Sequence, residues 1–182
     1  MKTQLILSAT QLPVLLSEAR DFLKVSHRDE DALIASYIRA ATEACESFTG
    51  RKLIRQQWQL TLNNWGGSVV EMPLSPLLSI DKIEYWSADN FQEIDAGNYL
   101  LDNVSYRAKI VPQTGYLWPD PEIAVAGIRI TVSAGFGEDW NDVPHDIRLG
   151  VLHWVTAAYD NGENQAVLMA EKLWQPYRRV SL

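Results

Sequence analysis

Two histidines near a helix start are the residues whose types most invite a chemical role. His145, followed by Asp146, lies eight residues before His153 in this 182-residue sequence. A metal site needs two or three imidazole or carboxylate groups that converge on one point. On a helix with 3.6 residues per turn, a spacing of eight projects the two imidazoles about 80° apart. The spacing therefore argues against a shared metal ion or a catalytic pair.

Other possible sites are equally incomplete. Glu43 and Glu46 could share a helix face as paired carboxylates, but we expect both on the solvated face. Gly135-Phe136-Gly137 lacks the third glycine and the following helix of a phosphate-binding loop, so it is interpreted as a turn. The single Cys45 falls in an apolar helical stripe, where a buried thiol is expected. We predict no catalytic, cofactor-binding or metal-binding residue and no enzyme.

Composition limits the classes of partner. Hydrophobic residues make up 47% of the chain, which is typical of a folded globular protein, and the net charge is −7. A nucleic-acid-binding surface would need clustered Lys and Arg, and no such stripe is present. No apolar run approaches the roughly 18 residues that cross a bilayer. We expect a soluble protein without a membrane partner, made in the cytoplasm.

The pattern of apolar residues changes twice along the chain. Spacings of three and four predict a helix over residues 29–49, ended by Gly50, after a shorter helix opened by Ser17 as N-cap. From residue 55 to 133 the period falls to two, as in short strands. Helix returns with Pro144 in its first turn, and a last helix covers residues 164–174. The predicted strands are 57–62, 69–72, 80–86, 99–101, 108–111 and 128–132.

This order predicts an α+β fold. A small helical bundle of residues 1–54 and 134–182 would be interrupted by an inserted antiparallel β domain of residues 55–133. The helix that follows Pro144 carries a second apolar stripe on another face. Such a helix must be covered on more than one side, either inside the bundle or at a subunit contact. The stripe proposed as the subunit contact is Leu149, Leu152 and Thr156.

Seven tryptophans leave a second interpretation open. Trp58, Trp86 and Trp154 fall within regular elements and are expected in the core. Trp65, Trp118 and Trp140 fall at turns, where exposed aromatic rings could stack on a ligand. The alternative function is therefore a ligand- or carbohydrate-binding β module with helical flanks.

Several short motifs occur together in one order. Residues 44–53, ACESFTGRKL, followed by Gln57-Trp58, resemble the E-x-x-T-G-R-x-L signature of phage head–tail connector, or adaptor, proteins. The chain resembles the branch that carries a β domain within the helical connector core, and it is similar to gene transfer agent adaptors. The further matching segments are 72–80 with 83–85, 110–112 with 118–119, 130–137, 143–148 and 175–179.

The resemblance implies a structural, non-enzymatic virion protein at the head–tail interface. Such connectors form a ring under the portal protein, commonly of twelve copies, which extends the DNA channel and offers an attachment platform to the tail. The implied partners are the portal, a tail-side connector or tail terminator protein, and other copies of the chain. DNA would pass through the channel without specific binding, which suits an acidic protein.

The carboxy-terminal tail, residues 174–182, is a candidate docking segment. Aromatic residues and Arg are enriched among the residues that dominate interface energies, and Pro176 ends the preceding helix. We expect this tail to dock against the portal; the alternative is that it folds back over its own bundle. The expected docking residues are Trp174, Pro176, Tyr177, Arg178 and Arg179.

Overall fold

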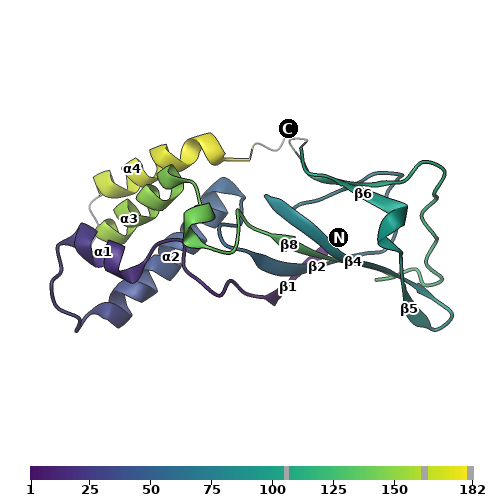
Figure 1. Ribbon diagram of the computed structural model, residues 1–182, viewed down its shortest axis with the longest axis horizontal. Coiled ribbons are helices and arrows are strands. Elements are labelled where there is room, and N and C mark those ends of the chain that lie inside the picture. The colour runs from purple at the N-terminus through teal and green to yellow at the C-terminus, as the bar shows by residue number, and fades with distance from the viewer. Residues whose placement is uncertain (105–106, 161–163, 180–182) are drawn as a thin grey trace. The chain divides into compact units, whose positions relative to one another are not determined.

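The computed structural model describes residues 1–104, 107–160 and 164–179 and has the predicted α+β fold. A strand and two helices come first, further strands follow, and helices return at the end (Figure 1). The chain divides into a sheet unit, Met1–Ser8 with Arg55–Gly135, and a helical unit, Ala9–Ile54 with the described residues from Phe136 onward. Residues 1–8 thus group with the strands, whereas we expected all of 1–54 with the helices.

The sheet unit is built on a five-stranded antiparallel sheet. At its centre, β8 (Ile128–Ala134) pairs with β2 (Gln56–Leu62) on one edge and with β4 (Leu77–Ser87) on the other. The outer strands are β1 (Lys2–Leu7) beside β2 and β5 (Asn90–Glu93) beside β4. Neither β1 nor β5 is among the strands that the sequence pattern predicted.

A smaller antiparallel sheet completes this unit. Its order is β3 (Val70–Glu71), β7 (Lys109–Pro112) and β6 (Tyr99–Asp102), and a single 3-10 turn, η1 (Ala96–Asn98), precedes β6. The apolar side chains of both sheets share one core, because β-branched residues alternate along the strands. Its fully buried members include Leu60, Met72, Ile83, Ile110, Ile128, Ile130 and Val132.

The helical unit is arranged around one central helix. α3 (His145–Tyr159) packs against α1 (Leu16–Leu23), α2 (Asp31–Thr49) and α4 (Asn164–Trp174). This position explains why α3 is apolar on more than one side: neighbouring helices of the same chain cover it. No helix in the described part of the chain is long and apolar enough to cross a membrane. The core includes Ile34, Ile38, Cys45, Ile147, Val151, Val155 and Trp174.

The helix ends differ in part from the expected ones. α1 begins at Leu16, and its N-cap is Leu15, which makes no side-chain cap, so the predicted Ser17 cap is wrong. Pro144 is the N-cap of α3 and not its first residue. Gly50 ends α2 as predicted, with a left-handed φ of 68° that glycine adopts without steric cost.

Candidate partner-docking segment

Trp174, the first residue of the predicted docking segment, is an internal anchor. Its side chain is 1% exposed, and its indole Nε1 donates a hydrogen bond to the carbonyl oxygen of Ile147 at 3.1 Å. The ring lies 6.1 Å from the ring of Phe48 on α2. A Cβ atom at Gly150 would lie 2.2 Å from the indole nitrogen, so α3 needs a glycine there. Trp174 therefore belongs to the core, and its expected direct contact with a partner is corrected.

The chain beyond Trp174 is tied to the end of α2. A 3-10 turn, η3 (Gln175–Tyr177), continues directly from α4. The carbonyl oxygen of Tyr177 accepts a hydrogen bond from Arg51 Nε at 2.7 Å, and the backbone N–H of Arg179 donates to the carbonyl oxygen of Thr49 at 2.8 Å. These contacts fix the path of the backbone across the carboxyl end of α2. Residues 180–182 of the predicted tail lie outside the described residues.

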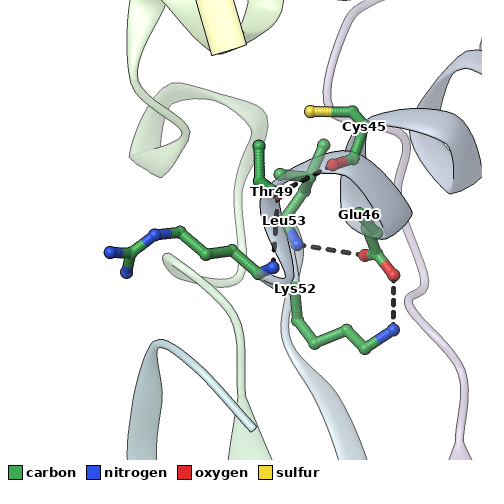
Figure 2. Close-up of polar contacts among 6 residues, drawn as sticks. Cys45, Glu46, Thr49, Lys52 and Leu53 are labelled. Atoms are coloured by element: carbon green, nitrogen blue, oxygen red, sulfur yellow. Dashed lines mark hydrogen bonds and ion pairs between the residues drawn. The ribbon is translucent and has the colours of Figure 1, made fainter. Parts of the chain in front are cut away.

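Residues of the E-x-x-T-G-R-x-L signature form the turn that holds this stretch of backbone. Figure 2 shows Glu46 reaching past the end of α2 toward Lys52 and Leu53. Its two carboxylate oxygens accept hydrogen bonds from the backbone N–H of Leu53 at 3.0 Å and from Lys52 Nζ at 2.7 Å. Only 10% of the Glu46 side chain is exposed, so its expected place on the solvated face is wrong. Glu43 does lie on that face.

Thr49 and Gly50 complete the turn. The Thr49 hydroxyl donates to the carbonyl oxygen of Cys45 at 2.7 Å and accepts from the backbone N–H of Arg51 at 3.2 Å (Figure 2). A Cβ atom at Gly50 would lie 3.5 Å from Cβ of Arg179, and the left-handed φ already disfavours other residues. The signature therefore reverses the chain after α2 and offers a carbonyl and a guanidinium to the carboxy-terminal segment.

The surface of this segment is polar and partly aromatic. Pro176 and Arg178 are exposed, and Tyr177 is half-buried with its ring edge-on to Phe136 at 6.5 Å. The Arg178 guanidinium lies 5.4 Å from the Phe48 ring centroid, within the range of a cation–π contact. A partner that meets this surface finds a side-chain set held by a fixed backbone. That arrangement reduces the entropy lost on binding.

The predicted subunit stripe on α3 faces largely inward. Leu152 is buried in the helical core, and Leu149 is half-buried. The Thr156 hydroxyl donates to the carbonyl oxygen of Leu152 at 3.1 Å within the helix. The chain itself thus covers much of this stripe.

The two histidines considered as a possible chemical pair lie in different surroundings. His145 is exposed, whereas His153 packs edge-on against Phe22 with ring centroids 5.3 Å apart. Among the described residues no group of three His, Cys, Asp or Glu side chains could hold a metal ion. Burial raises the pKa of the Cys45 thiol, and the nearby Glu46 charge acts in the same direction. A thiol held protonated is a poor nucleophile.

The tryptophans at turns of the sheet unit are mostly structural. Trp65 stacks on Trp118 at 4.5 Å beside an open hollow of about 460 Å³. Both indole N–H groups are engaged within the unit, by the carbonyl oxygens of Pro119 and Ser68 at 2.8 Å each. Trp65 is buried, and Trp58 and Trp86, which we expected in the core, are half-buried.

Solved structures show where this fold occurs. The chain is similar to proteins in the neck of an empty gene transfer agent particle with C6 symmetry (TM-score 0.83, 23% identity) and in a native gene transfer agent virion (0.85, 23%). A third match is in the neck of the native particle with C12 symmetry (0.79, 25%). Each match covers 100% of this chain and 97% of the other. No curated protein matches the sequence.

The family assignment comes from the sequence. The model of the phage gp6-like head-tail connector protein family matches residues 14–111, more than half of the chain and a range that includes the Glu46–Leu53 signature. This is a structural family and not an enzymatic one. The chain therefore belongs to the phage gp6-like head-tail connector protein family.

Proposed function

We propose that the protein forms a ring, of twelve copies in the assembled particle, beneath the portal. There it extends the DNA channel and provides the platform for a tail-side connector or tail terminator protein. The observation that carries the proposal is family membership across residues 14–111, supported by the full-length fold match to neck proteins of particles with C6 and C12 symmetry.

The net charge supports a conduit role. At −7, the chain disfavours tight binding of the DNA phosphates, which would slow DNA passing through the channel. Local attraction to a protein partner is then left to separate basic sites. Arg178 is exposed and is such a site within the helical unit.

Portal docking is assigned here to the segment that follows the Trp174 anchor. Pro176, Tyr177, Arg178 and Arg179 would make the contact, with the backbone held by Thr49 and Arg51. An Arg beside an aromatic ring on a preformed backbone is a common pattern at residues that dominate binding energy. Trp174 would act indirectly, because it fixes where this segment starts.

Cosedimentation with the portal ring of the same particle tests both levels of the proposal. The wild-type protein should cosediment with the portal. Arg178→Glu should weaken binding by about tenfold, because the loss of one important interface residue costs more than about 1 kcal/mol. Arg28→Glu, an equal charge change at an exposed loop of the helical unit, is the matched control and should bind as wild type does.

The outcomes distinguish the connector role from the assigned docking segment. Failure of the wild-type chain to bind the portal would contradict the connector role beneath it. Binding of Arg178→Glu at wild-type strength would leave that role in place and remove the assigned docking segment.

A further inference from the structure

The outer face of α4 carries apolar side chains that the described part of the chain leaves exposed. Leu168 is 56% exposed and Met169 is 44% exposed. Gln165 and Lys172, one turn away on either side, are also exposed. Residues three and four apart share a helix face, so these four side chains form one surface with an apolar centre, called here the α4 face.

A second exposed surface lies on α2 and has a different shape. Leu33, Ser36, Ala40 and Glu43 are all exposed, and their spacings of three, four and three place them on one face, called here the α2 face. Ser36 and Ala40 are small, so the middle of this face is shallow. Large side chains from another helix can approach its backbone closely there.

Contacts at the helix ends fix the directions of these helices. Trp174 at the end of α4 meets Phe48 near the end of α2 and Ile147 at the start of α3. At the other end of α3, the Tyr159 hydroxyl donates to the carboxylate of Glu30, the N-cap of α2. α2 and α4 therefore run in the same direction, antiparallel to α3, and Figure 1 shows them along opposite margins of the helical unit with α3 between them.

We propose that the α4 face of one copy packs against the α2 face of the next copy in the connector ring. This inference rests on the proposed ring and names the surfaces that build it. The two faces are different and belong to different sides of the helical unit, as a head-to-tail contact requires. A rotation about an axis along the helices keeps α2 and α4 parallel and at the same height.

The heights of the side chains then match. The rings of Trp174 and Phe48 lie 6.1 Å apart, which places the two residues within about one turn of the same height, and both helices rise about 1.5 Å per residue. Counting back along both helices, Leu168 and Met169 come level with Thr42 and Glu43, within one turn of Ala40. The two large apolar side chains thus lie at a height between Ala40 and Glu43, next to the shallow middle of the α2 face.

Charge complementarity favours the same pairing. Lys172 lies within one turn of Glu43 at these heights, and neither has an ion-pair partner within the described part of the chain. Two α4 faces brought together would give Lys172 no such partner, since it would meet its equivalent if the helices ran parallel and the uncharged Gln165 if they ran antiparallel. The pattern of charges thus favours a head-to-tail contact, which can close into a ring, over a two-fold dimer.

A disulfide experiment tests the contact in the assembled protein. The double variant Ala40→Cys with Leu168→Cys, mildly oxidised on the portal ring and also alone at high concentration, should give a ladder of covalent oligomers. A disulfide needs Cβ atoms about 4 Å apart, so the ladder reports direct apposition. The two single variants are the controls and should give none, since the native Cys45 is buried.

Ladder formation and portal binding together distinguish the proposed faces from the portal role. Portal binding without a ladder would overturn the proposed faces and leave the connector role standing. A ladder without portal binding would support the faces and contradict the portal role. Neither ladder nor portal binding would overturn both.

Charge exchange provides a second readout that does not depend on cysteine geometry. Lys172→Glu and Glu43→Lys should each lower self-association about fivefold, as expected from repulsion between like charges at a surface pair. The double exchange should restore it, and Arg28→Glu should have no effect. Additive losses in the double variant would show that the two residues do not face each other.

Discussion

The two units each contain a buried tryptophan bonded to a backbone carbonyl, but the chain beyond this anchor takes a different course in each. In the sheet unit, Trp65 donates to the carbonyl oxygen of Pro119 and stacks on Trp118, so its contacts join two segments of the same unit. In the helical unit, Trp174 donates to Ile147, and the chain then continues to the exposed Pro176 and Arg178. The anchoring ring is therefore structural in both units, and any docking role lies in the residues after it.

Replacing either buried tryptophan tests this difference between the units with the largest expected effect. Trp174→Ala and Trp65→Ala should each lower the free energy of unfolding by about 3–5 kcal/mol, the usual cost of a large cavity. Urea denaturation followed by circular dichroism measures the loss. At a temperature where both variants stay folded, only Trp174→Ala should also weaken cosedimentation with the portal. Equal portal binding by both variants would contradict the distinction.

Filling the space that Gly150 leaves for the Trp174 ring should have a smaller effect on stability. Gly150→Ala places a methyl group against the indole nitrogen and should cost about 1–3 kcal/mol through overpacking. Gly66→Asn is the control in the sheet unit, because its site is open and Asn tolerates a positive φ. We expect less than about 0.5 kcal/mol there. Thermal unfolding of both variants provides the test. Similar losses of stability would contradict the role assigned to Gly150.

The two carboxylates of α2 sharpen the comparison within the helical unit. Glu46→Ala leaves the N–H of Leu53 without its acceptor and should cost about 1–3 kcal/mol. Glu43→Ala should change the free energy of unfolding by less than about 0.5 kcal/mol, since its side chain is exposed. Chemical denaturation of the isolated protein measures both effects. An effect at Glu43 as large as that at Glu46 would refute the assigned roles.

The mildest probe concerns Cys45, whose raised pKa makes thiolate rare in the folded protein. A thiol reagent at pH 8 should label the native chain very slowly and the urea-unfolded chain within minutes. Rapid labelling of the folded protein would mean that the end of α2 opens readily. Wild type in urea is the positive control.

Regular periodicity let the sequence predict much of the fold. The bounds of α4 agree with the predicted ones, α2 starts two residues later than expected, and six strands fall where short alternating runs were found. Such patterns are readable because each element buries one face. β1 has no buried face, as all six of its residues are exposed, and so it lacks the alternation that marks a strand.

The docking segment was harder to predict because its geometry depends on long-range contacts. The polar type of Glu46 indicated solvent, yet the chain reverses at Gly50 and brings Lys52 and Leu53 back to its carboxylate. Trp174 looked available for a partner because nothing in the local sequence shows that Gly150, on another helix, leaves space for its ring. In both cases a residue distant in sequence decides exposure.

The bonds from Thr49 and Arg51 to the last described residues have an evolutionary consequence. The point where the chain leaves the helices for the inserted strands is also the point that holds the carboxy-terminal segment. Lineages could therefore enlarge, replace or delete the insert without relocating the segment, provided that Thr49, Gly50 and Arg51 persist. Natural variation should then concentrate in the insert, while this short junction changes little.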